Sequence, residues 1–203
     1  MDDFSKYTNN LTNALKGVDQ NLINKLKQEI INKFNEGGEI FIIGNGGSAA
    51  NAHHIAGDYL KTFALLGIKA KISCLSDNSC FLTAASNDLD YSESYEILVN
   101  TRIEKKDFLI FLSGSGNSIN LIKTATAAKR AGIKTAALIG YSGGGLKKIV
   151  DIPLHIEIND MEISEDIQII IFHYLKQQLF IELSSSSEIT PKYNKRVIED
   201  LIA

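Results

Sequence analysis

The stretch IFIIGNGGSAANAHHIA, residues 40–56, decides the fold of this chain. It opens with an apolar run typical of a buried parallel strand, passes through a turn rich in glycine, and continues with small residues that suit the start of a helix. The same plan returns in LIFLSGSGNSINLIKTA, residues 109–125. Because the carboxyl ends of parallel strands lie at one edge of a sheet, we expect the two turns to face a common crevice there.

Short apolar runs alternate with helical segments over most of the chain. The apolar runs predict strands at 40–43, 68–73, 108–112, 135–139 and 152–156. The segments between and after them predict helices at 48–63, 77–86, 91–103, 118–131, 144–149 and about 162–184. Strands that alternate with helices indicate the α/β class, so the sequence predicts a doubly wound, five-stranded parallel sheet flanked by helices.

An amphipathic segment precedes the first strand. Between residues 4 and 35, apolar side chains recur at three- and four-residue steps from Leu11 to Phe34, which predicts a helix that Gly37-Gly38 ends. The apolar side of this helix must pack against either the domain body or another subunit. We expect one domain over residues 1–184, which includes this N-terminal helical extension, and a C-terminal tail over residues 185–203.

Composition and charge restrict the class of protein. The 203 residues are 44% hydrophobic and 22% charged, as in ordinary globular proteins and unlike disordered chains. The formal net charge of -3 gives no overall basic field, so we expect no nucleic-acid partner. No apolar run reaches the ~18–20 residues that span a bilayer, and the amino terminus has no secretory pattern, so we expect a cytoplasmic protein without a membrane partner. We expect Cys74 and Cys80 to be reduced and packed as small apolar side chains.

The two turns have the chemistry of an anion site. Glycine lets a ligand approach the main chain closely, and the helix that follows each turn offers unpaired N–H groups and the positive end of its dipole. Neither turn has the glycine spacing of a dinucleotide site or the Gly-Lys-Ser/Thr of a P-loop. The sequence therefore predicts phosphate binding without lysine or arginine. The residues expected to bind substrate are Asn45, Gly46, Gly47, Ser48, Ser113, Gly114, Ser115 and Ser118.

Two helices carry pairs of metal-binding side chains. His54 and Asp58 are four residues apart, and Glu165 and His173 are eight residues apart, so each pair lies on one side of its helix. Imidazole and carboxylate groups from two helices can complete a four-ligand site for Zn²⁺ or a similar ion. Considered alone, each pair is more often a polar surface pair or a hydrogen-bonded core histidine.

The sequence resembles the sugar isomerase (SIS) domain family in four stretches, which are IIGNGGSAANAHHIAGD, LTAASND, FLSGSGNS and SEDIQIIIFHYL. The resemblance is strongest to the phosphoheptose isomerases of that family, and it runs from the N-terminal helix to about residue 183 in the same order and spacing. It implies a five-stranded parallel sheet, a homotetramer and active sites shared between subunits. It also implies that Asn87 and Asp88 contact the sugar.

The resemblance further implies roles for the residues of the two helices. His54 and His173 match metal-binding histidines, and His173 also matches an acid/base. Asp58 falls where these isomerases have a metal-binding glutamate that acts as the catalytic base, and Glu165 falls where they have a metal-binding glutamine. The shorter Asp58 and the charged Glu165 depart from that pattern. We expect the two changes to compensate, so that both act as catalytic carboxylates around one divalent ion per subunit, such as Zn²⁺.

The reaction expected from this resemblance is an aldose–ketose isomerisation. Sedoheptulose 7-phosphate would be converted to D-glycero-D-manno-heptose 7-phosphate through an enediol(ate), for the heptose of a surface polysaccharide such as lipopolysaccharide or capsule. Such a reaction needs a base, an acid and a group that stabilises the oxyanion. Two alternatives stay open. One is an SIS-domain isomerase of another sugar phosphate, and the other is a non-catalytic regulatory protein that binds a sugar phosphate.

Overall fold

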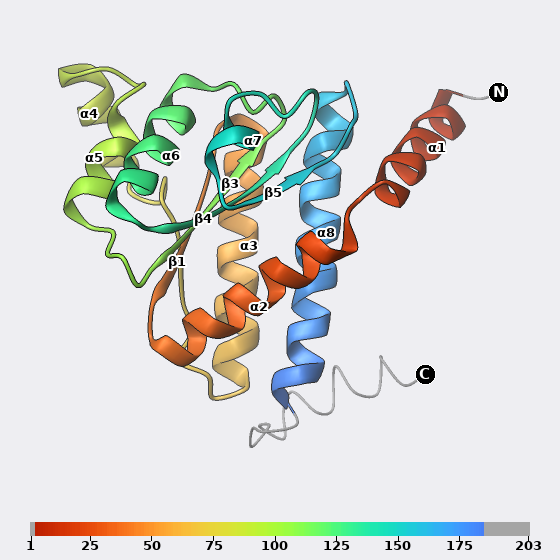
Figure 1. Ribbon diagram of the computed structural model, residues 1–203, viewed down its shortest axis with the longest axis horizontal. Coiled ribbons are helices and arrows are strands. Elements are labelled where there is room, and N and C mark those ends of the chain that lie inside the picture. Colours follow the sequence, from red (N-terminus) through yellow and green to blue (C-terminus); the bar gives the residue numbers. More distant parts are fainter. Residues whose placement is uncertain (1–2, 185–203) are drawn as a thin grey trace.

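Five parallel strands form the sheet at the centre of the computed structural model, which describes residues 3–184 (Figure 1). They are β1 (Glu39–Gly44), β2 (Lys71–Cys74), β3 (Phe108–Ser113), β4 (Lys134–Ile139) and β5 (Ile152–His155). Their order across the sheet is β2-β1-β3-β4-β5. The predicted α/β class is therefore confirmed. The strand expected at 68–73 begins later, at Lys71, because the backbone N–H groups of Ile68 and Ala70 are used locally, donating to the backbone oxygens of Phe63 and Ile68.

Helices cover both faces of this sheet, since the side chains of each strand alternate between the two faces. One face packs against α2 (Gln20–Glu36), α3 (Gly46–Leu65) and α8 (Met161–Ser184). The other packs against α5 (Ser94–Thr101), α6 (Ile119–Ala131) and α7 (Leu146–Ile149). A further helix, α4 (Ser79–Asp88), contacts α5. Strands with both faces buried explain why the sequence shows continuous apolar runs rather than alternation.

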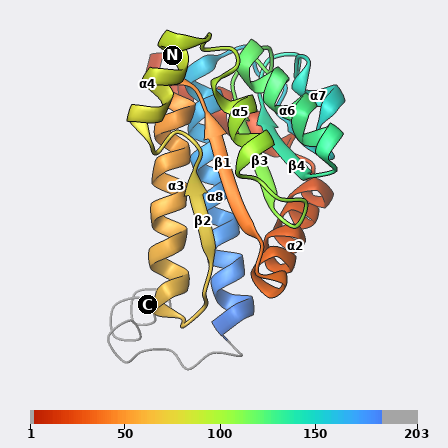
Figure 2. The same ribbon diagram turned by 90° about the vertical axis from the view of Figure 1, so that its left-hand side faces the viewer.

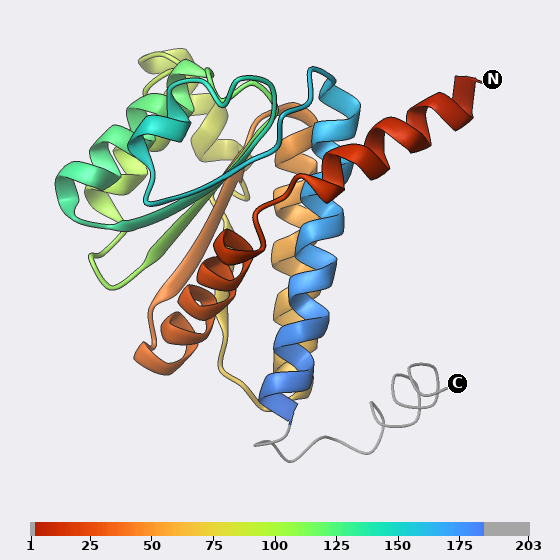
Figure 3. The same cartoon turned by 45° about the vertical axis from the view of Figure 1, so that its right-hand side comes forward.

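The segment expected to form one helix at 4–35 is instead two helices, α1 (Asp3–Lys16) and α2. Asp19 causes the break, because its side chain accepts a hydrogen bond from the backbone N–H of Asn21 at 2.8 Å and so begins a new helix. The expected end of the second helix is confirmed, with Gly37 in the left-handed conformation at a φ of 69°. Helix α1 has no buried residue and extends away from the sheet, as Figure 3 shows.

Helices α3 and α8 lie side by side and run in the same direction, away from the carboxyl edge of the sheet (Figures 1 and 2). Tyr59 on α3 fixes the pair from inside, since its hydroxyl donates to the backbone oxygen of Phe172 on α8 at 2.8 Å. Both side chains are almost fully buried. The two helices therefore pack directly against each other as one layer on this face of the sheet.

Three further expectations concern the cysteines, membrane-spanning helices and the C-terminal tail. Cys74 is buried as expected, whereas Cys80 is exposed because it lies in the first turn of α4, away from the sheet. Within residues 3–184, no helix is long and apolar enough to cross a membrane. The expected C-terminal tail, residues 185–203, lies outside the described residues.

Candidate functional site

The two glycine-rich turns meet at the carboxyl edge of the sheet, because β1 and β3 are neighbouring strands. With the first turns of α8 they enclose a cavity of about 110 Å³. The two predicted turns thus line one cavity. Its lining residues are Asn45, Ser48, Leu112, Ser113, Gly114, Ser115, Ser118, Leu121, Met161 and Glu165.

The second turn is shaped by its own serines. The backbone N–H of Gly116 donates to Ser113 Oγ at 3.0 Å, and that of Asn117 donates to Ser115 Oγ at 3.2 Å. Gly116 has a φ of 68°, which a residue with a side chain rarely adopts. Since both hydroxyl oxygens act as acceptors, their O–H groups remain to donate to a bound anion. The start of α6 behind this turn adds the positive end of a helix dipole.

The first turn is held by Asn120, a residue that the sequence analysis did not single out. Asn45 exchanges two hydrogen bonds with Asn120, at 3.0 Å and 2.9 Å, so the two amides face each other as a pair. Asn45 Oδ1 also accepts from the Tyr91 hydroxyl at 2.7 Å. Asn120 comes from α6, and Tyr91 from the turn before α5. These contacts join the start of α3 to the second turn and fix the Asn45 side chain at the cavity.

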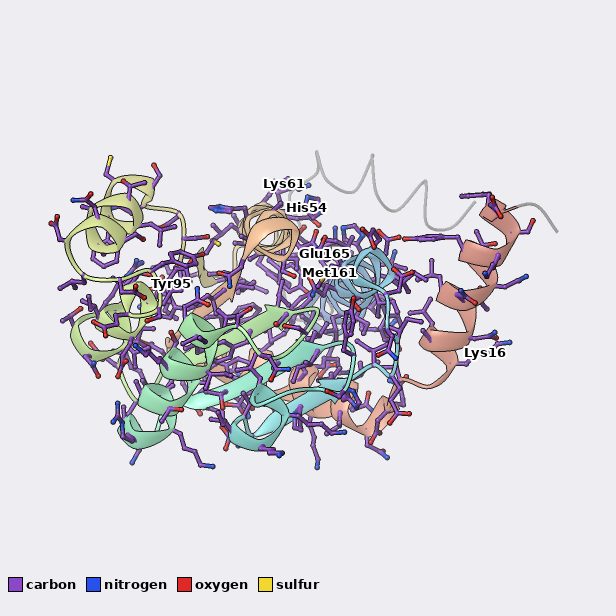
Figure 4. The ribbon with its side chains drawn as sticks, turned by 90° about the horizontal axis from the view of Figure 1, so that it is seen from above. Lys16, His54, Lys61, Tyr95, Met161 and Glu165 are labelled. Atoms are coloured by element: carbon purple, nitrogen blue, oxygen red, sulfur yellow. The ribbon has the colours of Figure 1, made fainter. Side chains whose placement is uncertain are left out.

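Glu165 reaches the cavity from α8 and lies directly against the first turn. A Cβ on Gly47 would come within 2.1 Å of Glu165 Oε2, so any side chain at this position would force the Glu165 carboxylate to move. Asn51 Nδ2 donates to the backbone oxygen of Glu165 at 2.9 Å, which ties the same stretch of α8 to α3. Figure 4 looks down on this edge and shows Glu165 and Met161 between α3 and α8. A carboxylate is therefore placed beside the two turns that the sequence predicts to bind phosphate.

The histidines expected to bind metal do come together. The Nε2 atoms of His54 and His173 are 2.9 Å apart, and the two rings lie edge to face at 77°. With an oxygen of Asp58, these two nitrogens form a group of possible ligand atoms that all lie within 4.8 Å of one another. Glu165 is not in this group. It precedes His173 by eight residues, which is about 12 Å along a helix, so it lies at the cavity instead.

The group fits a divalent transition metal in its chemistry, since imidazole nitrogen and carboxylate oxygen are ligands that such ions favour. The two imidazoles share one hydrogen bond between facing nitrogens, so one Nε2 must carry the proton that an ion would replace. Burial and the charges of Lys176 and His54 lower the pKa of His173, which favours the neutral ring that can bind a metal or accept a proton.

Asp58 has two basic partners, neither of which was expected from the sequence. Lys61 donates to Asp58 Oδ1 at 2.9 Å, and Lys176 contacts Oδ2 of the same carboxylate. Burial acts to raise the pKa of Asp58, but the hydrogen bonds from Lys176 and Lys61 outweigh it and lower the pKa below its usual value. A carboxylate in this state is a weaker base than a free one. The signal for Lys176 was its position three residues after His173, on the same side of α8.

The remaining candidates lie elsewhere. Asn87 and Asp88 end α4, are exposed, and bond to each other, with Asn87 Nδ2 donating to Asp88 Oδ1 at 2.9 Å. Neither residue lines the cavity formed by the described part of this chain. His53, next to His54 in the sequence, lies outside the ligand group, and its Nε2 is 3.2 Å from Ser76 Oγ. His155, at the end of β5, contacts the backbone oxygen of Tyr141 through Nε2 at 2.8 Å.

Comparisons with known proteins agree with this architecture. A sequence model of the SIS domain matches residues 3–140. A phosphoheptose isomerase from Helicobacter pylori is 35% identical over 165 residues, which cover 80% of this chain and 86% of that protein. One from Trichlorobacter lovleyi is 34% identical over 151 residues, or 74% of this chain and 77% of that protein.

A solved structure of a phosphoheptose isomerase from Francisella tularensis has the same fold. Its TM-score is 0.81 at 22% sequence identity, and the match covers 88% of this chain and 94% of that one. At this level of identity the likeness concerns the arrangement of strands and helices.

Proposed function

Because the chain belongs to the SIS domain family, we propose that it is a phosphosugar isomerase that converts sedoheptulose 7-phosphate to D-glycero-D-manno-heptose 7-phosphate. The observation that carries the proposal is the pairing of an anion-binding cavity with two facing histidines further along the same two helices. The choice of a heptose phosphate as the substrate follows from the relatives named phosphoheptose isomerase.

The two ends of the site suit the two ends of such a sugar. The phosphate binds in the cavity, to the backbone N–H groups and hydroxyls of the two turns, with Ser48, Ser113, Ser115 and Ser118 as donors. His173 lies about 12 Å beyond Glu165 along α8, so an extended seven-carbon chain directs its carbonyl end toward the histidines. Binding at the far end then positions the reacting carbons. Asn87 and Asp88 are proposed to contact the sugar from a neighbouring subunit or after α4 moves.

Proton transfer between the first two carbons falls to residues of α8. The neutral His173 can take the proton from one carbon and return it to the other through an enediol(ate). Glu165, at the cavity, can exchange a proton with the sugar hydroxyls. Asp58 is held by its ion pairs as a charged group beside His173, so it acts by orienting that ring and as a ligand rather than as a strong base.

A divalent ion, Zn²⁺ or a similar metal at one per subunit, is proposed to be held by His54, Asp58 and His173, with Glu165 as a further ligand if its side chain turns toward them. When bound, such an ion supplies a Lewis acid that stabilises negative charge on the sugar oxygens.

The wider setting is also a proposal. We infer a homotetramer, with support from α1, which has no buried residue, and from Ile170, Tyr174 and Ile181, which expose apolar surface on α8. Sedimentation of a monomer in the analytical ultracentrifuge would contradict it. A cytoplasmic location and a role in surface-polysaccharide heptose synthesis follow from the proposed substrate, a phosphorylated intermediate.

The test is turnover of sedoheptulose 7-phosphate by metal-loaded protein, followed by ³¹P and ¹H NMR. We expect signals of an aldoheptose 7-phosphate, their loss in His173→Ala, and their retention in His53→Ala, the neighbouring histidine outside the ligand group. If the substrate signals broaden but no product appears, the protein binds sugar phosphates without this activity. That outcome would favour another sugar phosphate or a regulatory role.

A further inference from the structure

The Asp58 carboxylate already has a cation on each oxygen. Lys61 Nζ lies 2.9 Å from Oδ1, and Lys176 Nζ contacts Oδ2. Carboxylate oxygens are the atoms by which an aspartate binds a divalent ion. Any ion that joins His54 and His173 must therefore share Asp58 with these ammonium groups or displace one of them.

The two lysines differ in how strongly they can compete. The Lys176 side chain is 23% exposed and the Asp58 side chain 11%, whereas the Lys61 side chain is 64% exposed. Attraction between exposed charges is weakened by water and salt, and an exposed pair contributes little. Lys176 is the shielded partner, so its charge acts on Asp58 with less screening.

Lys176 also lies close to a second member of the ligand group. It follows His173 by three residues on α8, and its charge acts on that imidazole as well as on Asp58. One ammonium group thus faces two of the three candidate ligands. Because it is tethered to the same helix, its effective concentration at the site is high at every metal concentration.

We propose that Lys176 is a built-in cation that competes with the divalent metal for Asp58, so that the site binds metal weakly and loads only when this lysine is displaced. The inference rests on the proposed metal site at His54, Asp58 and His173. It assigns Lys176 a positioning role: in the metal-free protein it compensates the charge of Asp58 and holds the carboxylate next to His173. A site with a neutral side chain at position 176 would keep its ion more tightly.

The test measures Zn²⁺ affinity of chelator-stripped full-length protein by competition with a chromogenic chelator, without reference to activity. We expect Lys176→Met to bind Zn²⁺ about 10–100-fold more tightly than the unchanged protein, the range by which groups next to metal ligands alter affinity. Lys61→Met, the matched control that removes the exposed partner of the other carboxylate oxygen, should change affinity by less than about threefold. Lys176→Arg keeps the positive charge, so its Zn²⁺ affinity should stay as weak as that of the unchanged protein.

The outcomes distinguish the role of Lys176 from the proposed metal site itself. Equal or weaker Zn²⁺ binding by Lys176→Met, or equal tightening by Lys176→Arg, would overturn the role of Lys176, while a loss of affinity in Asp58→Asn would still support the metal site. If Asp58→Asn and His54→Ala bind Zn²⁺ as well as the unchanged protein, the metal site itself is wrong. Thermal melts without and with Zn²⁺ check folding. Lys176→Met should have a lower melting temperature than the unchanged protein without the ion, and its melting temperature should rise more when Zn²⁺ is added.

Discussion

Gln168 on α8 donates from Nε2 to Ser48 Oγ in the first turn of α3, at 3.2 Å, and both side chains are buried. The other end of the same amide is also used, since Gln168 Oε1 accepts from Asn51 Nδ2 at 3.0 Å. A single side chain thus links α8 to the start of α3 at two points. The first glycine-rich turn and Glu165 are kept in register by this link.

Replacing Gln168 should therefore destabilise the protein. In Gln168→Ala, Ser48 and Asn51 each lose a buried partner, and we expect the free energy of unfolding to fall by about 1–3 kcal/mol. Urea unfolding followed by circular dichroism measures this. Gln177→Ala, on an exposed position of the same helix, is the matched control and should stay within about 0.5 kcal/mol. Equal effects in the two variants would show that the buried link is unimportant.

Removing the charge of Glu165 should strengthen phosphate binding. Its carboxylate lines the cavity proposed for the phosphate, and two negative groups in one cavity repel each other. We expect Glu165→Gln to bind sedoheptulose 7-phosphate about tenfold more tightly by calorimetry, and to turn it over more slowly if Glu165 exchanges protons. Glu162→Gln, one turn earlier and exposed, should bind as the unchanged protein does. Unchanged affinity in Glu165→Gln would place the phosphate elsewhere.

Tyr91 should affect substrate affinity more than stability. Its hydroxyl donates to Asn45 at 2.7 Å, while the ring is 44% exposed. In Tyr91→Phe, Asn45 keeps its pairing with Asn120 but loses one of its restraints, so we expect KM to rise about three- to tenfold. The urea midpoint should not move. A large loss of stability with an unchanged KM would mean that Tyr91 supports the fold rather than the site.

Docking of α1 should weaken in alkali. The hydrogen bond from the Tyr7 hydroxyl to Asp166, at 2.7 Å, together with burial and nearby acidic groups, raises the pKa of Tyr7 to about 12 from an ordinary value of 10.0. A raised pKa favours the neutral phenol in the folded state. The stability that this contributes is fully present below pH 10 and is lost as the pH rises toward 12.

The urea midpoint of the unchanged protein should accordingly approach that of Tyr7→Phe between pH 10 and 12, while the difference between them stays constant at lower pH. Asp166→Ala removes the same hydrogen bond and should behave as Tyr7→Phe does. A constant difference up to pH 12 would contradict the assignment.

Much of the fold could be predicted from local patterns. The turns that follow residues 43 and 112 indicated a shared edge because parallel strands must end together there, and the cavity is at that edge. The prediction of a single helix at 4–35 was wrong because the helical spacing of apolar residues continues across Gly17 and Asp19. The Asp19 cap, which begins the second helix, has only a local signal in the sequence. Periodicity describes the faces of a helix and not its interruptions.

The candidate site could be predicted only in part. Spacing grouped Glu165 with His173, but their separation along α8 assigns one to the cavity and the other to the histidine pair. Asn120, Tyr91 and Lys176 were missed because their partners lie on other elements, and pairing of this kind depends on how helices pack. Nothing in the sequence alone fixes which residue of α8 lies beside Asp58.

The parallel course of α3 and α8 also limits how this chain can vary in length. Gly47 lies against Glu165, His54 against His173, and Asp58 against Lys176. One residue inserted into α3 after Ser48 would rotate everything beyond it by about 100° and separate the last two pairs, while the glycine turn stayed intact. Insertions and deletions should therefore be tolerated in the loops before β2 and after β5, and be rejected within these two helices.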